Sequence, residues 1–159
     1  FPVDGPSRRR VAYRLFRTRT GGAVPPKYFT VGEANALLPT LRPILERIAE
    51  KRQELQAKRE ALAVFRHQAA GNGHHLASPD FLALRKEADF IGEEMQAEIQ
   101  NVHDLGCLLK DLDQLLVDFP ALRAGREILL CWKADEDRVS FWHGTEEGFA
   151  GRKPLEGTG

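Results

Sequence analysis

The residues best suited to chemistry lie in the last third of the chain, where acidic side chains and one histidine stand beside short apolar runs. Asp111 and Asp113 would face the same way if their strand continues, because side chains two residues apart share a face. With Asp118 and His143 they offer carboxylate oxygens and an imidazole nitrogen. Such a group can bind a divalent metal or perform acid–base catalysis. Asp111, Asp118 and His143 are therefore candidate metal ligands.

The same residues also have a purely structural interpretation. Aspartates beside turns commonly cap backbone N–H groups, and a histidine at a strand end commonly bonds a backbone carbonyl. The spacing matches no established metal motif, since the sequence contains neither HExxH nor CxxC. Arg152, which follows a Gly-Phe-Ala-Gly segment, could clamp an anion or bridge an acidic side chain. We favour the structural roles and the ion pair, and keep the metal site and the anion contact as alternatives.

Positive charge is concentrated at the start of the chain. Residues 1–29 carry one acidic residue, Asp4, against seven basic ones: Arg8, Arg9, Arg10, Arg14, Arg17, Arg19 and Lys27. The whole chain has a formal net charge of +0, so the rest of it is acidic. Gly, Pro and Arg dominate the start without a helical apolar period, which predicts a basic flexible arm over residues 1–27. Its arginines can contact an acidic partner surface or nucleic acid.

The middle of the chain predicts a long helical hairpin over about residues 30–105. Thr30 and Glu33 form a capping box, and apolar residues then recur every three or four positions. A glycine-containing segment at 71–77 breaks the helix, and Ser78 caps the next one. Short polar connections join antiparallel helices. The distal half carries few large apolar residues, so we expect it to be exposed or to pair with another subunit in a four-helix bundle.

The last third has the apolar pattern of strands. Short apolar runs at 107–111 and 115–119 come first, and Pro120 is expected to end the second of them. Residues 127–132 give the strongest strand signal, and residues 139–143 follow as its hairpin partner.

Together these segments predict an α+β fold, a long antiparallel helical hairpin packed against a small antiparallel β-sheet. We expect a single domain over residues 28–159, with a β-rich unit at about 107–143 and a C-terminal loop at 144–159. Tyr28 and Phe29 could add an edge strand.

The two cysteines, Cys107 and Cys131, stand in apolar surroundings and form no CxxC pair. Two buried thiols in a reducing compartment are the simpler interpretation, which favours the cytoplasm. The sequence has no run of ~18 apolar residues, so no membrane span is expected.

Several short motifs make the chain similar to a bacterial family known as domain of unknown function 2203. They are Phe29-Thr30, Glu33-Ala34, Leu38-Pro39, Lys110-Asp111-Leu112-Asp113, Leu116-Val117-Asp118-Phe119-Pro120, Leu130-Cys131-Trp132, Trp142-His143 and Gly148-Phe149-Ala150-Gly151-Arg152. The resemblance covers about residues 28–155 and implies no activity. The chain departs from the pattern at Leu115, where the pattern has glycine, and at residues 134–137, which replace a glycine-acid turn.

The function that the sequence favours is a non-enzymatic interaction or accessory protein, which docks through its hairpin and its basic arm. Phosphate-binding loops, nucleophile elbows and dinucleotide fingerprints are missing from the sequence. One alternative is a small protein or enzyme that uses a divalent metal at the Asp/His cluster. Another is a protein associated with the ribosome or with nucleic acid through the arm.

Overall fold

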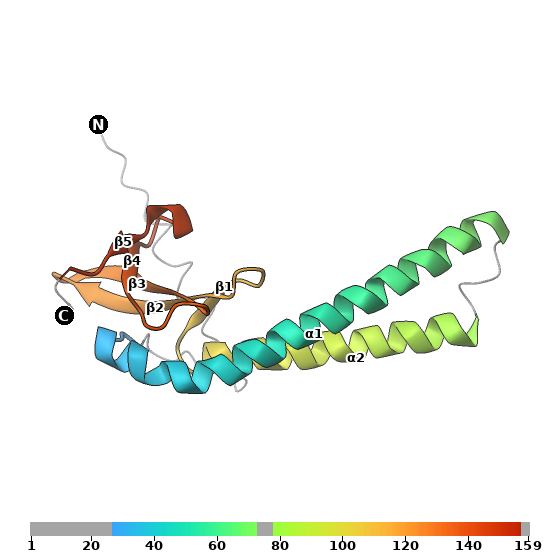
Figure 1. The fold of residues 1–159 in the computed structure, drawn as a ribbon, viewed down its shortest axis with the longest axis horizontal. Coiled ribbons are helices and arrows are strands. Elements are labelled where there is room, and N and C mark those ends of the chain that lie inside the picture. The colour runs from blue at the N-terminus through green and yellow to red at the C-terminus, as the bar shows by residue number, and fades with distance from the viewer. Residues whose placement is uncertain (1–26, 73–77, 157–159) are drawn as a thin grey trace, which may run out of the picture. The chain divides into compact units, whose positions relative to one another are not determined.

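The protein is described by a computed structural model, which defines residues 27–72 and 78–156. Two helices are followed by strands and one 3₁₀ turn, in the order α1 (Val31–Asn72), α2 (Pro79–Asp104), β1 (Leu108–Asp111), β2 (Leu116–Arg123), β3 (Arg126–Lys133), β4 (Phe141–Gly144), η3 (Phe149–Gly151) and β5 (Lys153–Pro154) (Figure 1). The predicted α+β fold with a helical hairpin and an antiparallel sheet is confirmed. Within the described ranges, no helix is long and apolar enough to cross a membrane.

The chain divides into two compact units. One unit comprises residues 1–39 with 102–159, and so holds the sheet, the first turns of α1 and the end of α2. The other comprises residues 40–101, the bodies of the two helices. Of the predicted arm, only Lys27 lies among the described residues.

Both helices begin at the caps that the sequence predicts. The backbone N–H of Thr30 donates to Oε2 of Glu33 at 2.9 Å, and the N–H of Glu33 donates to Oγ1 of Thr30 at 3.1 Å. The N–H of Phe81 donates to Oγ of Ser78 at 3.2 Å. Each bond satisfies a backbone donor that has no partner inside its helix.

A glycine with a left-handed backbone conformation follows the end of α2. Gly106 has a φ of +92°, and a Cβ placed there would lie 3.3 Å from the ring of Phe29. Both the backbone conformation and the close approach therefore favour glycine at this position.

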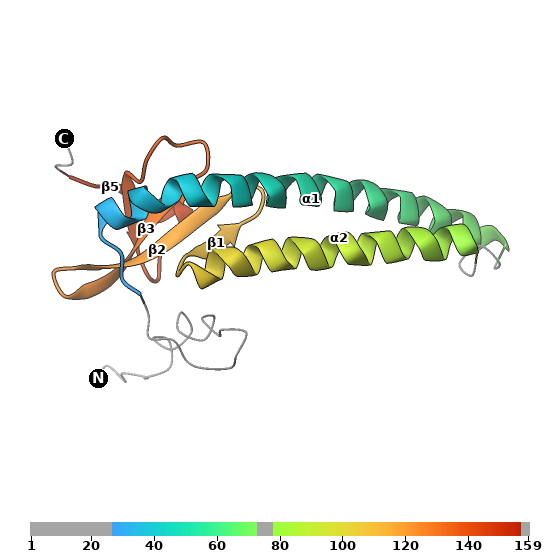
Figure 2. The ribbon, with the colours of Figure 1, turned by 90° about the horizontal axis from the view of Figure 1, so that it is seen from below.

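The helical unit has a narrow apolar core. In it α1 and α2 run antiparallel, side by side in both views (Figures 1 and 2). The buried residues are Leu55, Leu62, Phe81, Ala88 and Ile91, with Phe65, Leu84 and Met95 partly buried against them. The rings of Phe65 and Phe81 meet edge to face at 5.9 Å. This core occupies one stripe of each helix, as expected from the thin apolar pattern of the distal half.

Three ion pairs close one side of the helix pair. They are Arg47–Glu98 at 2.6 Å, Lys51–Glu94 at 2.7 Å and Lys58–Glu87 at 2.7 Å. Surface ion pairs of this kind add little to the free energy of unfolding, so their main consequence is to fix the alignment of the two helices.

The sheet has five antiparallel strands in the order β1-β2-β3-β4-β5. β2 and β3 are joined by Ala124 and Gly125, which have φ values of 50° and 73°. Two successive positive φ values are typical of the two-residue hairpin turn that matches the twist of antiparallel strands. The turn sets the register, so that Arg123 lies opposite Arg126 and Asp118 lies opposite Cys131.

The prediction that Pro120 ends its strand is wrong. β2 continues through Pro120 to Arg123. β1 pairs with β2 only as far as Asp118, and the carbonyl of Pro120 accepts instead from the N–H of Phe29 at 2.7 Å. Proline lacks an N–H, and it is tolerated here because that edge of the strand has no ladder to continue.

The ends of the described chain also differ from the prediction. Residues 27–30 do not form an edge strand; Phe29 makes its single bond to β2 and packs its ring edge-on against Phe119 at 5.4 Å. The segment 144–159, expected as a loop, contains η3 and the short strand β5, which pairs with β4. A strand of two residues carries too little apolar pattern to be recognised from the sequence.

Candidate metal centre

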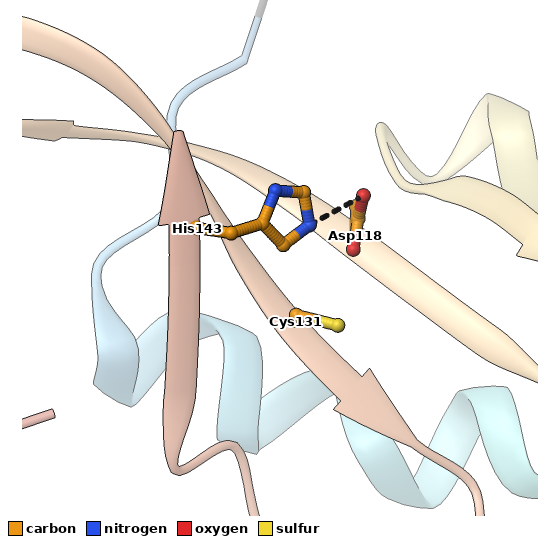
Figure 3. Close-up of side chains that lie close together, drawn as sticks. All are labelled: Asp118, Cys131 and His143. Carbon is orange, nitrogen blue, oxygen red and sulfur yellow. Dashed lines mark hydrogen bonds and ion pairs between the residues drawn. The ribbon is translucent and has the colours of Figure 1, made fainter. Parts of the chain in front are cut away.

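Three neighbouring strands bring Asp118, Cys131 and His143 together on one face of the sheet. Asp118 on β2 lies opposite Cys131 on β3. His143 on β4 lies opposite Leu129, two residues from Cys131 on the same strand. Residues two apart share a face, so all three side chains point to the same side (Figure 3).

The potential ligand atoms of these three residues form a tight, buried group. A carboxylate oxygen, a thiol sulfur and an imidazole nitrogen all lie within 4.8 Å of one another. The residues are only 2%, 1% and 3% exposed, in the order Asp118, Cys131 and His143. We call this group the Asp–Cys–His cluster.

Hydrogen bonds orient the ring of His143 from both sides. Nδ1 lies 2.8 Å from the carbonyl oxygen of Gly144, which can only accept, so Nδ1 carries a proton. Nε2 lies 3.1 Å from Oδ2 of Asp118. The bond to Asp118, and after it the bond to Cys131, raises the pKa of His143 to about 10, against burial, which lowers it. At neutral pH and without a metal, the ring of His143 is therefore protonated and lies beside Asp118.

One oxygen of the cluster has no hydrogen-bond partner. Oδ1 of Asp118 is buried and unbonded among the residues that the structure describes. A buried carboxylate oxygen left unsatisfied costs free energy, and such atoms commonly mark a bound water or ion. The described part of the chain thus leaves one acceptor site of the cluster unfilled.

The arrangement suits a four-coordinate divalent metal. Ligands that bind a metal at ~2.0 Å in tetrahedral geometry stand about 3.3 Å apart, close to the 3.1 Å between Nε2 of His143 and Oδ2 of Asp118. A metal-bound histidine usually donates its second N–H to a carbonyl or carboxylate, which is the role that Gly144 fills here. Thiolate, imidazole and carboxylate are the three ligand types that proteins use for Zn²⁺.

The structure separates the candidates that the sequence grouped together. Asp118 and His143 meet, whereas Asp111 lies outside the cluster at the end of β1. There its Oδ1 accepts from the backbone N–H groups of Asp113 and Gln114 at 2.7 and 2.9 Å. Asp111 therefore has the turn-capping role of the structural interpretation, and because β1 ends at Asp111 the expected strand that would align Asp113 with it does not continue.

Arg152 makes the ion pair that the sequence analysis favoured. Its Nη2 lies 2.7 Å from Oε2 of Glu136 and donates to the carbonyl of Cys131 at 3.2 Å. The guanidinium also lies over the ring of Phe141, 4.1 Å from its centre. These contacts tie the η3 segment to the sheet. The other predicted anion or partner contacts, Arg8, Arg9, Arg10, Arg14, Arg17 and Arg19, lie outside the described residues.

Cys131 is the member of the cluster that sequence reasoning missed. Its part in the site depends on the register of β2 and β3. Assuming a two-residue hairpin turn at Ala124 and Gly125 would have placed Cys131 opposite Asp118.

Fold and cluster together define a small α+β protein with a buried group of side chains whose types can ligate a metal. The chain belongs to the family of uncharacterized conserved proteins DUF2203, whose profile matches residues 27–155. The resemblance predicted from the motifs is thereby confirmed. No match was found among curated proteins or among solved structures.

Proposed function

We propose that this protein binds one Zn²⁺ per chain at Asp118, Cys131 and His143. The observation that carries this proposal is the convergence of three different ligand types from three strands within 4.8 Å. The unbonded Oδ1 of Asp118 supports it, because a second carboxylate oxygen can complete the coordination or hold a bound water.

The role of the metal follows from burial. A catalytic zinc keeps one coordination position open to substrate, whereas a structural zinc is enclosed. With each ligand residue no more than 3% exposed, the cluster has the character of a structural site. Zn²⁺ would link β2, β3 and β4, and its binding free energy would add to the stability of the sheet.

Zinc binding would displace protons from the cluster. The thiol of Cys131 loses one proton as it becomes a thiolate ligand, and the imidazolium of His143 loses the proton on Nε2. Gly144 keeps the proton on Nδ1, so the ring presents Nε2 to the metal in the required tautomer.

Metal analysis of the purified protein tests this proposal, with Asp111→Asn and Asp118→Asn as a matched pair of variants. The wild type and Asp111→Asn should hold one zinc per chain, because asparagine can still cap the turn after β1. Asp118→Asn should bind much less. Zinc added to chelator-treated wild type should raise its melting temperature, since a ligand at 100 times its Kd adds about 2.7 kcal/mol. Protein without zinc, and without a thermal shift on adding it, would refute the proposal.

A second candidate function is an interaction protein that docks through the hairpin and the basic arm. The observation in its favour is that Val64, Leu82 and Phe90 on the two helices are each more than half exposed. Deleting residues 1–26 should remove the partners captured at low salt if the arm takes part. If the shortened protein captures the same partners, the arm does not take part in binding them. The nucleic-acid alternative predicts steep weakening of binding by salt, and a flat salt profile would exclude it.

A further inference from the structure

The two sides of the helical unit differ in how their charges are paired. One side is closed by the ion pairs Arg47–Glu98, Lys51–Glu94 and Lys58–Glu87. The opposite side carries a groove of about 850 Å³ between the helices. We call it the open groove; it is lined by Leu55, Arg59, Leu62, Arg66, Arg85, Ala88, Asp89, Gly92, Glu93 and Gln96.

The charged side chains of the open groove have no partners among the residues that the structure describes. No ion pair or hydrogen bond joins the side chains of these residues to any residue in 27–72 or 78–156: Arg59, Arg66, Arg85, Asp89 and Glu93. Both signs of charge line the groove, yet the described residues leave these side chains unpaired, in contrast to the opposite side. Charges arranged in this way are available to a partner.

The floor of the groove is apolar and open at its centre. Leu55, Leu62 and Ala88 belong to the core of the unit and retain 5–6% exposure. At Gly92 an added Cβ would meet no atom within 4 Å, so another surface can approach the backbone there. An apolar floor with a charged rim is the usual composition of a protein interface.

Negative and positive side chains occupy different stretches along the length of the groove. In the three ion pairs the α1 number rises from 47 to 58 while the α2 number falls from 98 to 87, which fixes the alignment of the helices. By this alignment Glu93 and Asp89 of α2 lie opposite residues 52–56 of α1. The three arginines lie farther along the groove, Arg59 and Arg66 on α1 and Arg85 of α2 opposite the stretch between them. The groove therefore has an acidic end and a basic end.

We propose that a second copy of this chain occupies the open groove, so that two helical units form an antiparallel four-helix bundle. A two-fold rotation that reverses the helix direction lays the acidic end of each copy over the basic end of the other. Asp89 and Glu93 of one copy then face the guanidinium groups of its partner, and the remaining exposed surface of the apolar floors is covered. The inference rests on the docking role of the hairpin, the second candidate above, and is independent of zinc binding.

The mass of the full-length protein in solution, measured by light scattering at low salt, gives the first test. The expected value is twice the 17.9 kDa of one chain, and it should fall toward that of one chain as salt is raised. A single-chain mass at all micromolar concentrations would overturn the proposal.

Charge exchange gives a sharper test. One variant combines Arg59→Glu, Arg66→Glu and Arg85→Glu, so that its groove is wholly acidic; the other combines Asp89→Arg and Glu93→Arg, so that its groove is wholly basic. Each should be monomeric alone, and an equal mixture of the two should form a heterodimer. Variants that stay dimeric alone, or a mixture that stays monomeric, would contradict the two-fold arrangement.

Three controls separate this result from a general effect of charge, from misfolding and from the metal site. Lys58→Glu breaks an ion pair on the closed side of the helices and should leave the dimer intact. Helical circular dichroism should be unchanged in both groove variants. Their zinc content should equal that of the wild type, so a failure of dimerisation is distinct from a failure of metal binding.

Discussion

Nε2 of His143 lies 3.1 Å from Oδ2 of Asp118, and the two side chains are almost fully buried. A buried ion pair is weak evidence for stability, because the cost of desolvating two charges offsets much of their attraction. Its position beside the thiol of Cys131 is what gives the pair a functional meaning.

The metal-free protein should lose stability as the pH rises above neutral. The pKa of His143 is raised to about 10 in the folded protein, against an ordinary value of about 6.5. A group with a raised folded pKa stabilises fully below the unfolded value and loses this contribution as pH rises through the folded value. Urea unfolding of chelator-treated protein between about pH 6 and pH 10 measures this loss of stability. His143→Gln should remove this part of the pH dependence, and parallel profiles for the two proteins would contradict the account.

Removing one partner of the pair should cost more than removing both. Asp118→Leu leaves the imidazole of His143 buried without its carboxylate, which lowers the free energy of unfolding by ~3–5 kcal/mol. The double variant Asp118→Leu/His143→Leu replaces both polar groups with apolar ones and should recover most of that loss. Denaturant unfolding of the two variants without metal makes the comparison. A double variant no more stable than Asp118→Leu would show that the pair is not the source of the effect.

The thiol of Cys107 should be inert in the folded protein. Burial raises its pKa to about 12, so almost none of it is thiolate at neutral pH. In a Cys131→Ser background, a thiol reagent should modify Cys107 only as fast as the protein unfolds. Modification at the rate of a free cysteine would contradict its burial.

Glycine should be favoured over alanine at position 115. Leu115 has a φ of 50°, a conformation that residues with a Cβ adopt at a cost. Leu115→Gly should therefore be more stable than Leu115→Ala by about 1 kcal/mol, since the two variants differ little in side-chain packing. Denaturant unfolding measures the difference. Equal stability of the two would mean that the turn after β1 relaxes without strain.

Local signals predicted the helices well, whereas the site needed information that is not local. Thr30 and Glu33 mark the start of α1 because the bonds of a capping box join residues three apart. Pro120 was wrongly predicted to end its strand, because its place in β2 depends on how far β1 extends along that edge.

The Asp–Cys–His cluster depends on both local residue types and non-local strand pairing. Asp118 and His143 stood out by residue type. Cys131 belongs to the cluster only because of the register of β2 and β3, and Asp111 lies outside it because its carboxylate caps a turn. Residue types can suggest a site, but pairing between strands decides its members.

Cobalt substitution tests the central claim most directly, because Co²⁺ bound to a thiolate gives a charge-transfer absorption band that reports the ligand itself. The two buried cysteines provide a matched pair of variants, since Cys107 lies outside the cluster and Cys131 within it. We expect wild type and Cys107→Ser to develop the band at one Co²⁺ per chain, and Cys131→Ser to lack it. A wild type without the band, or a band that survives in Cys131→Ser, would contradict a metal centre at Asp118, Cys131 and His143.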